Sequence, residues 1–324
     1  MSQPAFDPGF TQQYRGDLRR IINPDGQFNV HRHGTTWRDA HPYLYMINAS
    51  WPAFLAWIFA SYVATNFVFA LVYYYDVGIS HLPGAEASTA GARFLNAFFF
   101  SAHTLTTVGY GNIRPQGILA NSVAAFEAFL GLLAFALATG LLFGRFSRPV
   151  ARIAFSTAMV VAPYQDGAAL QFRVANRRRN NLMELEARVL LMTIERSDGT
   201  DGVMRRRYRP LALERDKVLF LPLTWTIVHP IDDSSPLWGK TAEDLAALGA
   251  EVLILIKGFD DTFFQTVHVR YSYRFDQIVW DARFASTFEV DSQGRMILDL
   301  ARLSQLEPAR DLALEAGSAP SRTS

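Results

Sequence analysis

The chain has 324 residues, of which 50% are apolar and 19% are charged, and its formal net charge is +1. This length allows two domains. The balanced charge, with two short arginine runs at 177–179 and 205–207, argues against nucleic-acid binding, and the absence of a phosphate-binding loop, nucleophile elbow or metal-ligand spacing argues against an enzyme.

The amino-terminal residues 1–34 give no structural signal and are expected to form a tail. Residues 35–50 place aromatic side chains such as Trp37 and Tyr43 beside charged ones, which is typical of a helix lying at the membrane interface. Pro42 would interrupt such a helix, so an ordinary juxtamembrane linker is the alternative.

Two long apolar segments follow, at 51–75 and 117–146. The first carries no charge, and the second carries only Glu127 before Gly144. At about 1.5 Å per residue, each can cross a hydrocarbon core of about 30 Å, so we expect two transmembrane helices. Buried helices of a soluble protein are the alternative, but these are seldom apolar on every face.

Arginine residues predict how the spans are oriented. Only Arg93 and Arg114 lie between the two spans. The arginines that flank the spans on their other side are Arg15, Arg19, Arg20, Arg32, Arg38, Arg145, Arg148 and Arg152. The positive-inside rule therefore predicts that both termini lie in the cytoplasm.

Between the spans, residues 92–105 are apolar but too few to cross a membrane, which favours a re-entrant pore helix. The stretch TTVGYGN, residues 106–112, begins where that helix would end. An ion in a narrow pore exchanges its water for other oxygens, which rings of backbone carbonyls can supply. Inward-pointing carbonyls require alternating backbone conformations, and Gly109 and Gly111 accept positive φ at little cost.

We therefore predict that this stretch is a selectivity filter. Its expected residues are Thr107, Val108, Gly109, Tyr110 and Gly111, with potassium held by the first four carbonyls and the Thr107 hydroxyl. T-V-G-Y-G is the filter sequence of potassium channels, and a chance turn between two strands is the alternative. One copy per chain implies a homotetramer.

Helical spacing places one stripe of the second span on a single face: Ala128, Leu132, Phe135, Thr139 and Phe143. If this face lines the pore, Phe143 near the cytoplasmic end can form a hydrophobic gate. Ordinary packing between helices is the alternative. Gly131 and Gly140 could permit either bending or close packing.

Up to Gly144, Glu127 is the only charged residue in either span, so it must be paired, protonated or hydrated. Both support of the pore helix and an ion-facing role remain open. At the end of the second span and just after it, Arg145, Arg148 and Arg152 can share a face and attract anionic lipid headgroups, although simple positive-inside anchoring explains them equally well.

Residues 147–305 read as a cytoplasmic β domain. In QTVHVRYSYRF, residues 265–275, apolar and polar residues alternate as in a half-buried strand. Further strands are expected at 187–195, 217–226 and 251–258, and a short helix between Thr241 and Gly249. Several short strands favour a β-sandwich, and residues 306–324 are expected to be a tail.

Residues 35–305 resemble the inward-rectifier potassium channels, most closely their prokaryotic branch. The resemblance rests on WRDAHPYLYMINASWPAF, TTVGYGN, ATGLLFGRFSRPVARIAFS and HPIDDSSPLWG. It implies an interfacial slide helix, a pore domain of two spans and a pore helix, an immunoglobulin-like cytoplasmic sandwich, and regulation by phosphoinositides whose sign differs between branches. It also implies a multi-pass protein of the bacterial inner membrane.

Three positions depart from the pattern of the resembling channels. Strong rectifiers carry an acidic or amide residue where this chain has Phe135, so weak rectification is expected. The position of a filter-supporting glutamate is held by His103, for which a pH-sensitive role and a neutral packing role are both open. Asn112 replaces the aspartate that often follows the filter.

We therefore expect a potassium-selective channel, gated by lipid and its cytoplasmic domain, that needs no cofactor besides its permeant ion. Two alternatives stay open: a membrane-anchored sensing or scaffold protein with a vestigial pore, and a poorly selective cation channel.

Overall fold

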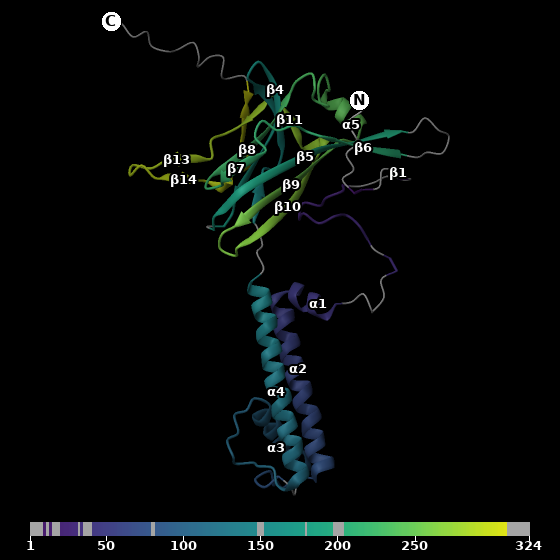
Figure 1. The fold of residues 1–324 in the computed structure, drawn as a ribbon, viewed down its shortest axis with the longest axis vertical. Coiled ribbons are helices and arrows are strands. Elements are labelled where there is room, and N and C mark those ends of the chain that lie inside the picture. Colours follow the sequence, from purple (N-terminus) through teal and green to yellow (C-terminus); the bar gives the residue numbers. More distant parts are fainter. Residues whose placement is uncertain are drawn as a thin grey trace. The chain divides into compact units, whose positions relative to one another are not determined.

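The chain, seen in a computed structural model, divides into two compact units (Figure 1). One comprises Arg32–Arg148, and the other joins Met1–His31 to Pro149–Ser324. The structure describes residues 9–10, 13–14, 20–31, 33–34, 41–78, 82–147, 152–178, 180–196 and 204–309.

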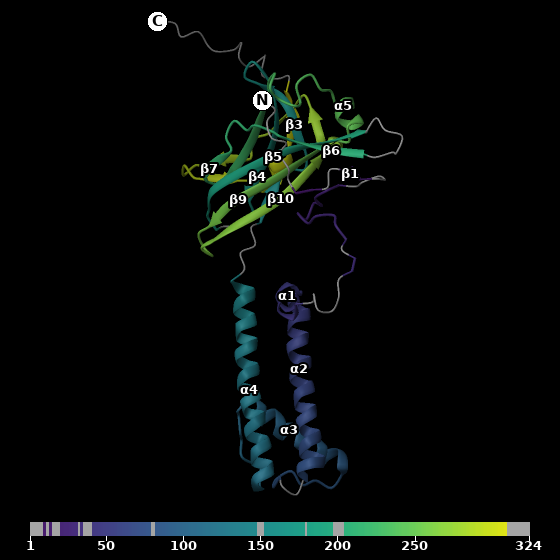
Figure 2. The same cartoon turned by 45° about the vertical axis from the view of Figure 1, so that its right-hand side comes forward.

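The helical unit is built from two long apolar helices and two short ones. Its elements are α1 (Pro42–Asn48), α2 (Trp51–Leu71) with a π-helical continuation (Val72–Gly78), α3 (Ala90–Leu105) and α4 (Gly117–Phe146). Trp51–Val77 and Gly117–Phe146 are long and apolar enough to cross a membrane. The short α3 contacts both α2 and α4 at the ends of these helices that lie away from α1 (Figures 1 and 2).

The predicted boundaries of this unit agree closely with the observed ones, and the differences have local causes. The second span matches 117–146, while the pore helix begins at Ala90, after the Thr89 side chain caps it by accepting from Ala92 N at 3.2 Å. Pro42 does not interrupt α1 but begins it, because a first-turn residue needs no N–H donor. Residues 35–40 of the expected slide helix lie outside the described residues.

The β unit consists of two main sheets and two small ones. The larger sheet has the order β1-β6-β5-β9-β10, with β7 also pairing β5, and the other has β11-β3-β4-β2, with β8 pairing β4. The strands are β1 (Gln13–Tyr14), β2 (Ile153–Phe155), β3 (Met159–Tyr164), β4 (Gly167–Asn176), β5 (Leu182–Arg196), β6 (Met204–Pro210), β7 (Lys217–Phe220), β8 (Thr224–Ile231), β9 (Glu251–Asp260), β10 (Gln265–Arg274), β11 (Ile278–Trp280), β12 (Ala282–Phe284), β13 (Phe288–Val290), β14 (Met296–Leu298) and β15 (Leu306–Pro308).

An apolar cluster joins the two main sheets. Phe172 of β4 and Ile227 of β8 meet Leu185 of β5 and Ile254 of β9 in one buried cluster. The expected short helix is α5 (Ala242–Ala247), and Thr241 and Asp244 form its capping box.

Two expectations about the β unit were wrong at their boundaries. Residues 217–226 form two strands, β7 and β8, which pair with different sheets, and Pro222 between them has no N–H for a strand ladder. The expected tail 306–324 includes β15, which pairs with β12, and Leu306 packs on the apolar cluster around Phe284.

The expected amino-terminal tail 1–34 likewise contains a packed segment, residues 20–31, here called the arm. Ile21 and Ile22 are buried with Met192, Tyr208 and Leu253 of the larger sheet. The arm therefore packs on the larger sheet in an apolar cluster of its own, separate from the core between the two main sheets.

Candidate functional site: the filter and its supports

The stretch after α3 has the alternating backbone that a carbonyl-lined filter requires. Three alternate residues have positive φ: Thr107 at 60°, Gly109 at 56° and Gly111 at 82°. For the two glycines this conformation is available without strain, whereas Thr107 must be held in it by its surroundings.

Hydrogen bonds from the filter to the end of α3 provide that support. Val108 N and Gly109 N donate to the His103 carbonyl at 2.9 and 3.3 Å, and Thr107 N donates to the Thr104 carbonyl at 3.0 Å. The candidate filter therefore begins directly at the carboxyl end of α3, where the helix dipole favours a cation.

His103 also contacts the outer part of the filter through its side chain. Its ring meets the Tyr110 ring edge-on, with centroids 4.8 Å apart, and the imidazole is half-buried. This contact matches the packing role that was one of the two options for His103.

The far end of the filter rests on the loop before α3. Gly84 has φ +93°, and a Cβ there would lie 2.0 Å from the carbonyl oxygen of Asn112. Arg114 N donates to the Pro83 carbonyl at 3.2 Å. Because only a glycine fits this approach, Gly84 fixes where the chain leaves the filter.

Glu127 lies behind the filter and is fully buried between three helical segments. The Tyr73 hydroxyl donates to Glu127 Oε2 at 2.7 Å, and the Ser101 hydroxyl lies 2.5 Å from Oε1. Ser101 Oγ is also 3.0 Å from Asn66 Oδ1, and Asn66 Nδ2 donates to the Tyr62 carbonyl at 2.7 Å. These contacts favour support of α3 over the ion-facing option.

Three members of this network were not predicted from the sequence: Asn66, Tyr73 and Ser101. Asn66 alone carried a signal, because a side-chain amide within an apolar span needs a polar partner. The partners themselves come from segments far apart in the sequence, so their meeting could not be read from spacing.

The proposed pore-lining face of α4 is open in the single chain. Phe135 and Phe143 are 75% and 71% exposed, and Leu132 and Thr139 are also exposed. Gly131 instead packs against the end of α3, because a Cβ there would lie 2.0 Å from the Leu105 carbonyl oxygen. Of the two options for Gly131, the structure shows close packing, here against the end of α3.

The three arginines of the expected lipid site have different surroundings. Arg145 donates to the carbonyls of Met46, Ile47 and Ala49 at 2.6, 3.0 and 2.8 Å, and its guanidinium lies 4.6 Å from the centroids of Trp51 and Phe54. It therefore ties α4 to the end of α1. Arg148 lies outside the described residues.

Arg152 belongs to the β unit. Together with Arg177 and Arg178 it lines a hollow of about 600 Å³. The Arg152 carbonyl accepts from Arg177 N at 2.9 Å.

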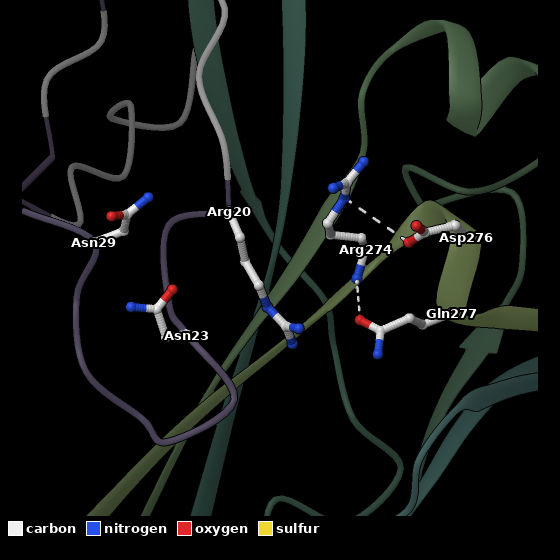
Figure 3. A pocket seen from close by; sticks show the side chains of 6 residues that line it. All are labelled: Arg20, Asn23, Asn29, Arg274, Asp276 and Gln277. Atoms are coloured by element: carbon white, nitrogen blue, oxygen red, sulfur yellow. Dashed lines mark hydrogen bonds and ion pairs between the residues drawn. The ribbon is translucent and has the colours of Figure 1, made fainter.

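The arm is held to β9 and β10 by polar contacts as well as by its isoleucines. Ile21 N donates to both oxygens of the buried Glu251 at 3.1 and 3.0 Å, and Arg20 Nε donates to Ser272 Oγ at 2.9 Å. Ser272 in turn donates to the Ile22 carbonyl at 2.9 Å. Figure 3 shows the pocket beside this contact, where Arg20 of the arm and Arg274 at the end of β10 lie on its wall.

The HPIDDSSPLWG motif contains a buried histidine whose partners lie in the same chain. His229 Nδ1 is 2.6 Å from the Ala212 carbonyl oxygen, and Nε2 is 2.8 Å from Ser235 Oγ. A carbonyl only accepts, so Nδ1 carries the proton and Nε2 accepts from Ser235. Burial lowers the pKa of His229 below its ordinary value, which keeps this ring neutral.

Two apolar helices long enough to span a membrane, a short helix between them, and a filter of alternating backbone together define the pore-forming chain of an ion channel. Comparison with known proteins narrows this class. Residues 57–148 match the family described as "Ion channel", and residues 153–316 match "Inward rectifier potassium channel C-terminal domain".

Individual relatives agree. The inward rectifier potassium channel Kirbac3.1 of Paramagnetospirillum magnetotacticum is 37% identical over 292 residues, which cover 89% of this chain and 95% of that protein. The G protein-activated inward rectifier potassium channel 3 of Mus musculus is 27% identical, covering 89% of this chain and 78% of that protein. Among solved structures, the Bacillus subtilis sporulation control protein Spo0M matches 41% of this chain and 50% of that chain at 10% identity, with a TM-score of 0.23.

The chain therefore belongs to the inward-rectifier potassium channel family. It is an integral membrane ion channel with two spans and not an enzyme, and its family implies potassium as the permeant ion and a tetrameric assembly.

Proposed function

We propose that four copies of this chain form one pore and select potassium at Thr107, Val108, Gly109, Tyr110 and Gly111. The observation that carries this proposal is the positive φ at residues 107, 109 and 111. With alternate residues in this conformation, successive carbonyls can turn toward one axis and replace the hydration shell of the ion. Glu127 and His103 support the filter from behind and beside it.

The pore below the filter is proposed to be lined by Leu132, Phe135, Thr139 and Phe143, with Phe143 as the gate. Four phenyl rings can close a narrow constriction by excluding water. The exposure of Phe135 and Phe143 in the single chain supports this arrangement, because large exposed apolar side chains need lipid or neighbouring chains around them.

Rectification is proposed to be weak. Cytoplasmic magnesium or polyamine is held in a pore by negative charge, and position 135 offers a phenyl ring instead. Glu127, the only carboxylate of α4, is buried away from the exposed face that carries Phe135. The pore therefore lacks the negative charge at position 135 that would hold a blocking magnesium ion or polyamine.

Gating is proposed to involve anionic lipid, phosphoinositide among the candidates, and the cytoplasmic β domain, which we take to be an immunoglobulin-like sandwich. Arg145, Arg148 and Arg152 are the proposed lipid contacts. For Arg145 the effect of lipid on gating would be indirect, because its guanidinium N–H groups already donate to carbonyls at the end of α1. Both termini are proposed to lie in the cytoplasm, and the bacterial relative favours the bacterial inner membrane.

Rubidium uptake into liposomes containing the purified protein tests the proposed filter. We expect uptake that barium blocks and sodium does not compete with, and a Gly109→Asp variant should lose it because both its side chain and its positive φ disrupt the carbonyl ring. Competition by sodium would favour a poorly selective channel. Equal flux in both proteins, or none in any lipid mixture, would favour a sensing scaffold with a vestigial pore.

A further inference from the structure

The carboxyl group of Glu127 is buried, and no basic side chain of the described residues pairs with it. Its side chain is met by Tyr73 from the end of the first span and by Ser101 from α3, and Asn66 of α2 stands behind Ser101. Among the described residues, Tyr73 is the only titratable group that contacts it, and no lysine, arginine or histidine forms an ion pair with it. A buried carboxylate with no counter-charge is strongly disfavoured.

The hydrogen-bond donors and acceptors of the network independently indicate that Glu127 is protonated. Asn66 Nδ2 donates to the Tyr62 carbonyl, so the amide oxygen Oδ1 must be the atom that faces Ser101. A flipped amide would instead place two acceptors 2.7 Å apart. Ser101 therefore has to use its single hydroxyl proton on Asn66 Oδ1, and it has none left for Glu127.

The contact between Ser101 Oγ and Glu127 Oε1 then needs a proton from the glutamate. An ionised Glu127 would leave an acceptor facing an acceptor, whichever way the serine hydroxyl turns. A protonated Glu127 completes an unbroken series: Tyr73 O–H to Oε2, Oε1–H to Ser101, Ser101 O–H to Asn66, and Asn66 N–H to the Tyr62 carbonyl.

We propose that Glu127 is a neutral carboxylic acid in the folded channel and acts as a positioning residue that fixes α3, and with it the filter, by donating its proton to Ser101. The inference rests on the proposed function of residues 107–111 as the filter. Ser101 lies in the last two turns of α3, whose final carbonyls hold Val108 and Gly109. A shift of α3 would therefore move the ion sites.

Infrared spectroscopy of the reconstituted channel tests the protonation state directly. Exposed carboxyl groups ionise near about pH 4 and lose their acid C=O stretch above it. At pH 7 we expect the wild-type spectrum minus that of Glu127→Gln to show one carboxylic-acid band. Glu86→Gln is the matched control, because Glu86 is exposed in the loop before α3, and its subtraction should show no such band. An ionised carboxylate band in the Glu127 difference spectrum would overturn the proposal.

Function provides the second readout. Glutamine can donate from Nε2 to Ser101 and accept at Oε1 from Tyr73, so Glu127→Gln should keep barium-sensitive rubidium flux within about twofold of wild type. Glu127→Leu leaves the Tyr73 hydroxyl without its acceptor and Ser101 without its donor, and it should lower flux by about tenfold or more. Failure of the Glu127→Gln tetramer to assemble or conduct would overturn the proposal.

The experiments distinguish an error about the protonation of Glu127 from an error about the proposed filter. A wild-type channel without selective flux would contradict the filter assignment, whereas the infrared band reports on Glu127 whether or not ions pass.

Discussion

Two glycines of α4, Gly131 and Gly140, differ sharply in their surroundings. A Cβ at Gly131 would lie 2.0 Å from the Leu105 carbonyl oxygen and 3.2 Å from its Cα, and both of these are backbone atoms. A Cβ at Gly140 would meet no atom of the described chain within 4 Å. The end of α3 cannot give way easily, because the filter follows it directly.

We therefore expect opposite effects from the same substitution at the two sites. Gly131→Ala should destabilise the tetramer by about 1–3 kcal/mol per chain through overpacking and should lower rubidium flux. Gly140→Ala should be neutral or stabilise by about 1 kcal/mol, because alanine is the better helix former. Thermal denaturation of the detergent-solubilised tetramer measures both, and equal behaviour of the two variants would contradict this account.

The residues of the proposed filter stand out in the sequence because the chemistry of a filter demands particular residue types at fixed spacing, with glycine at 109 and 111. The supports behind the filter could not. Ser101 and Tyr73 are 26 and 54 residues from Glu127, and nothing in local periodicity marks them as its partners. Positive φ at Thr107 was also unforeseen, because a β-branched residue rarely adopts it.

At the scale of elements, the arm and the last strand were both missed as parts of the β unit. Neither Ile21–Ile22 nor Leu306–Pro308 shows a long alternating pattern, and each is ordered by contacts with strands more than 20 residues away. The longer β9 and β10 could be predicted, since their apolar residues recur over ten-residue strands. Short elements depend on their neighbours, so the sequence carries little signal for them.

The arm can be tested through Ser272, which both accepts from Arg20 and donates to Ile22. Ser272→Ala leaves a buried carbonyl unpaired, at a cost of about 1–3 kcal/mol. We expect backbone amides of residues 20–31 to exchange with deuterium roughly tenfold faster or more, because local opening then costs less free energy. Hydrogen exchange with mass spectrometry measures this.

Ser286→Ala is the control, because Ser286 is exposed and bonds only locally to the Phe288 carbonyl at 3.0 Å. If arm exchange rose equally in both variants, or in neither, the contacts at Ser272 would not be what holds the arm.

For the whole molecule, the single chain is incomplete in two respects. Large apolar side chains cover α2 and α4, among them Trp57, Phe59 and Phe129, each more than half exposed, which a folded monomer in water does not tolerate. One filter strand also supplies only one quarter of each ring of carbonyls. A surrounding bilayer covers the exposed apolar side chains, and three partner chains complete the rings of carbonyls, in keeping with the tetrameric family.

Rectification is a property of that whole assembly, and Phe135 gives it a sharp test. In symmetrical potassium with cytoplasmic magnesium, wild-type currents should be nearly equal in both directions, while Phe135→Asp should block outward current. A divalent ion that crosses about half of the membrane field gains about 2.3 kcal/mol per 100 mV, so the block should deepen about fiftyfold over that range. Single-channel recording in planar bilayers measures this, with Phe135→Leu as the uncharged control. Strong block of wild type, or no voltage dependence in Phe135→Asp, would mean that α4 presents another face to the ions.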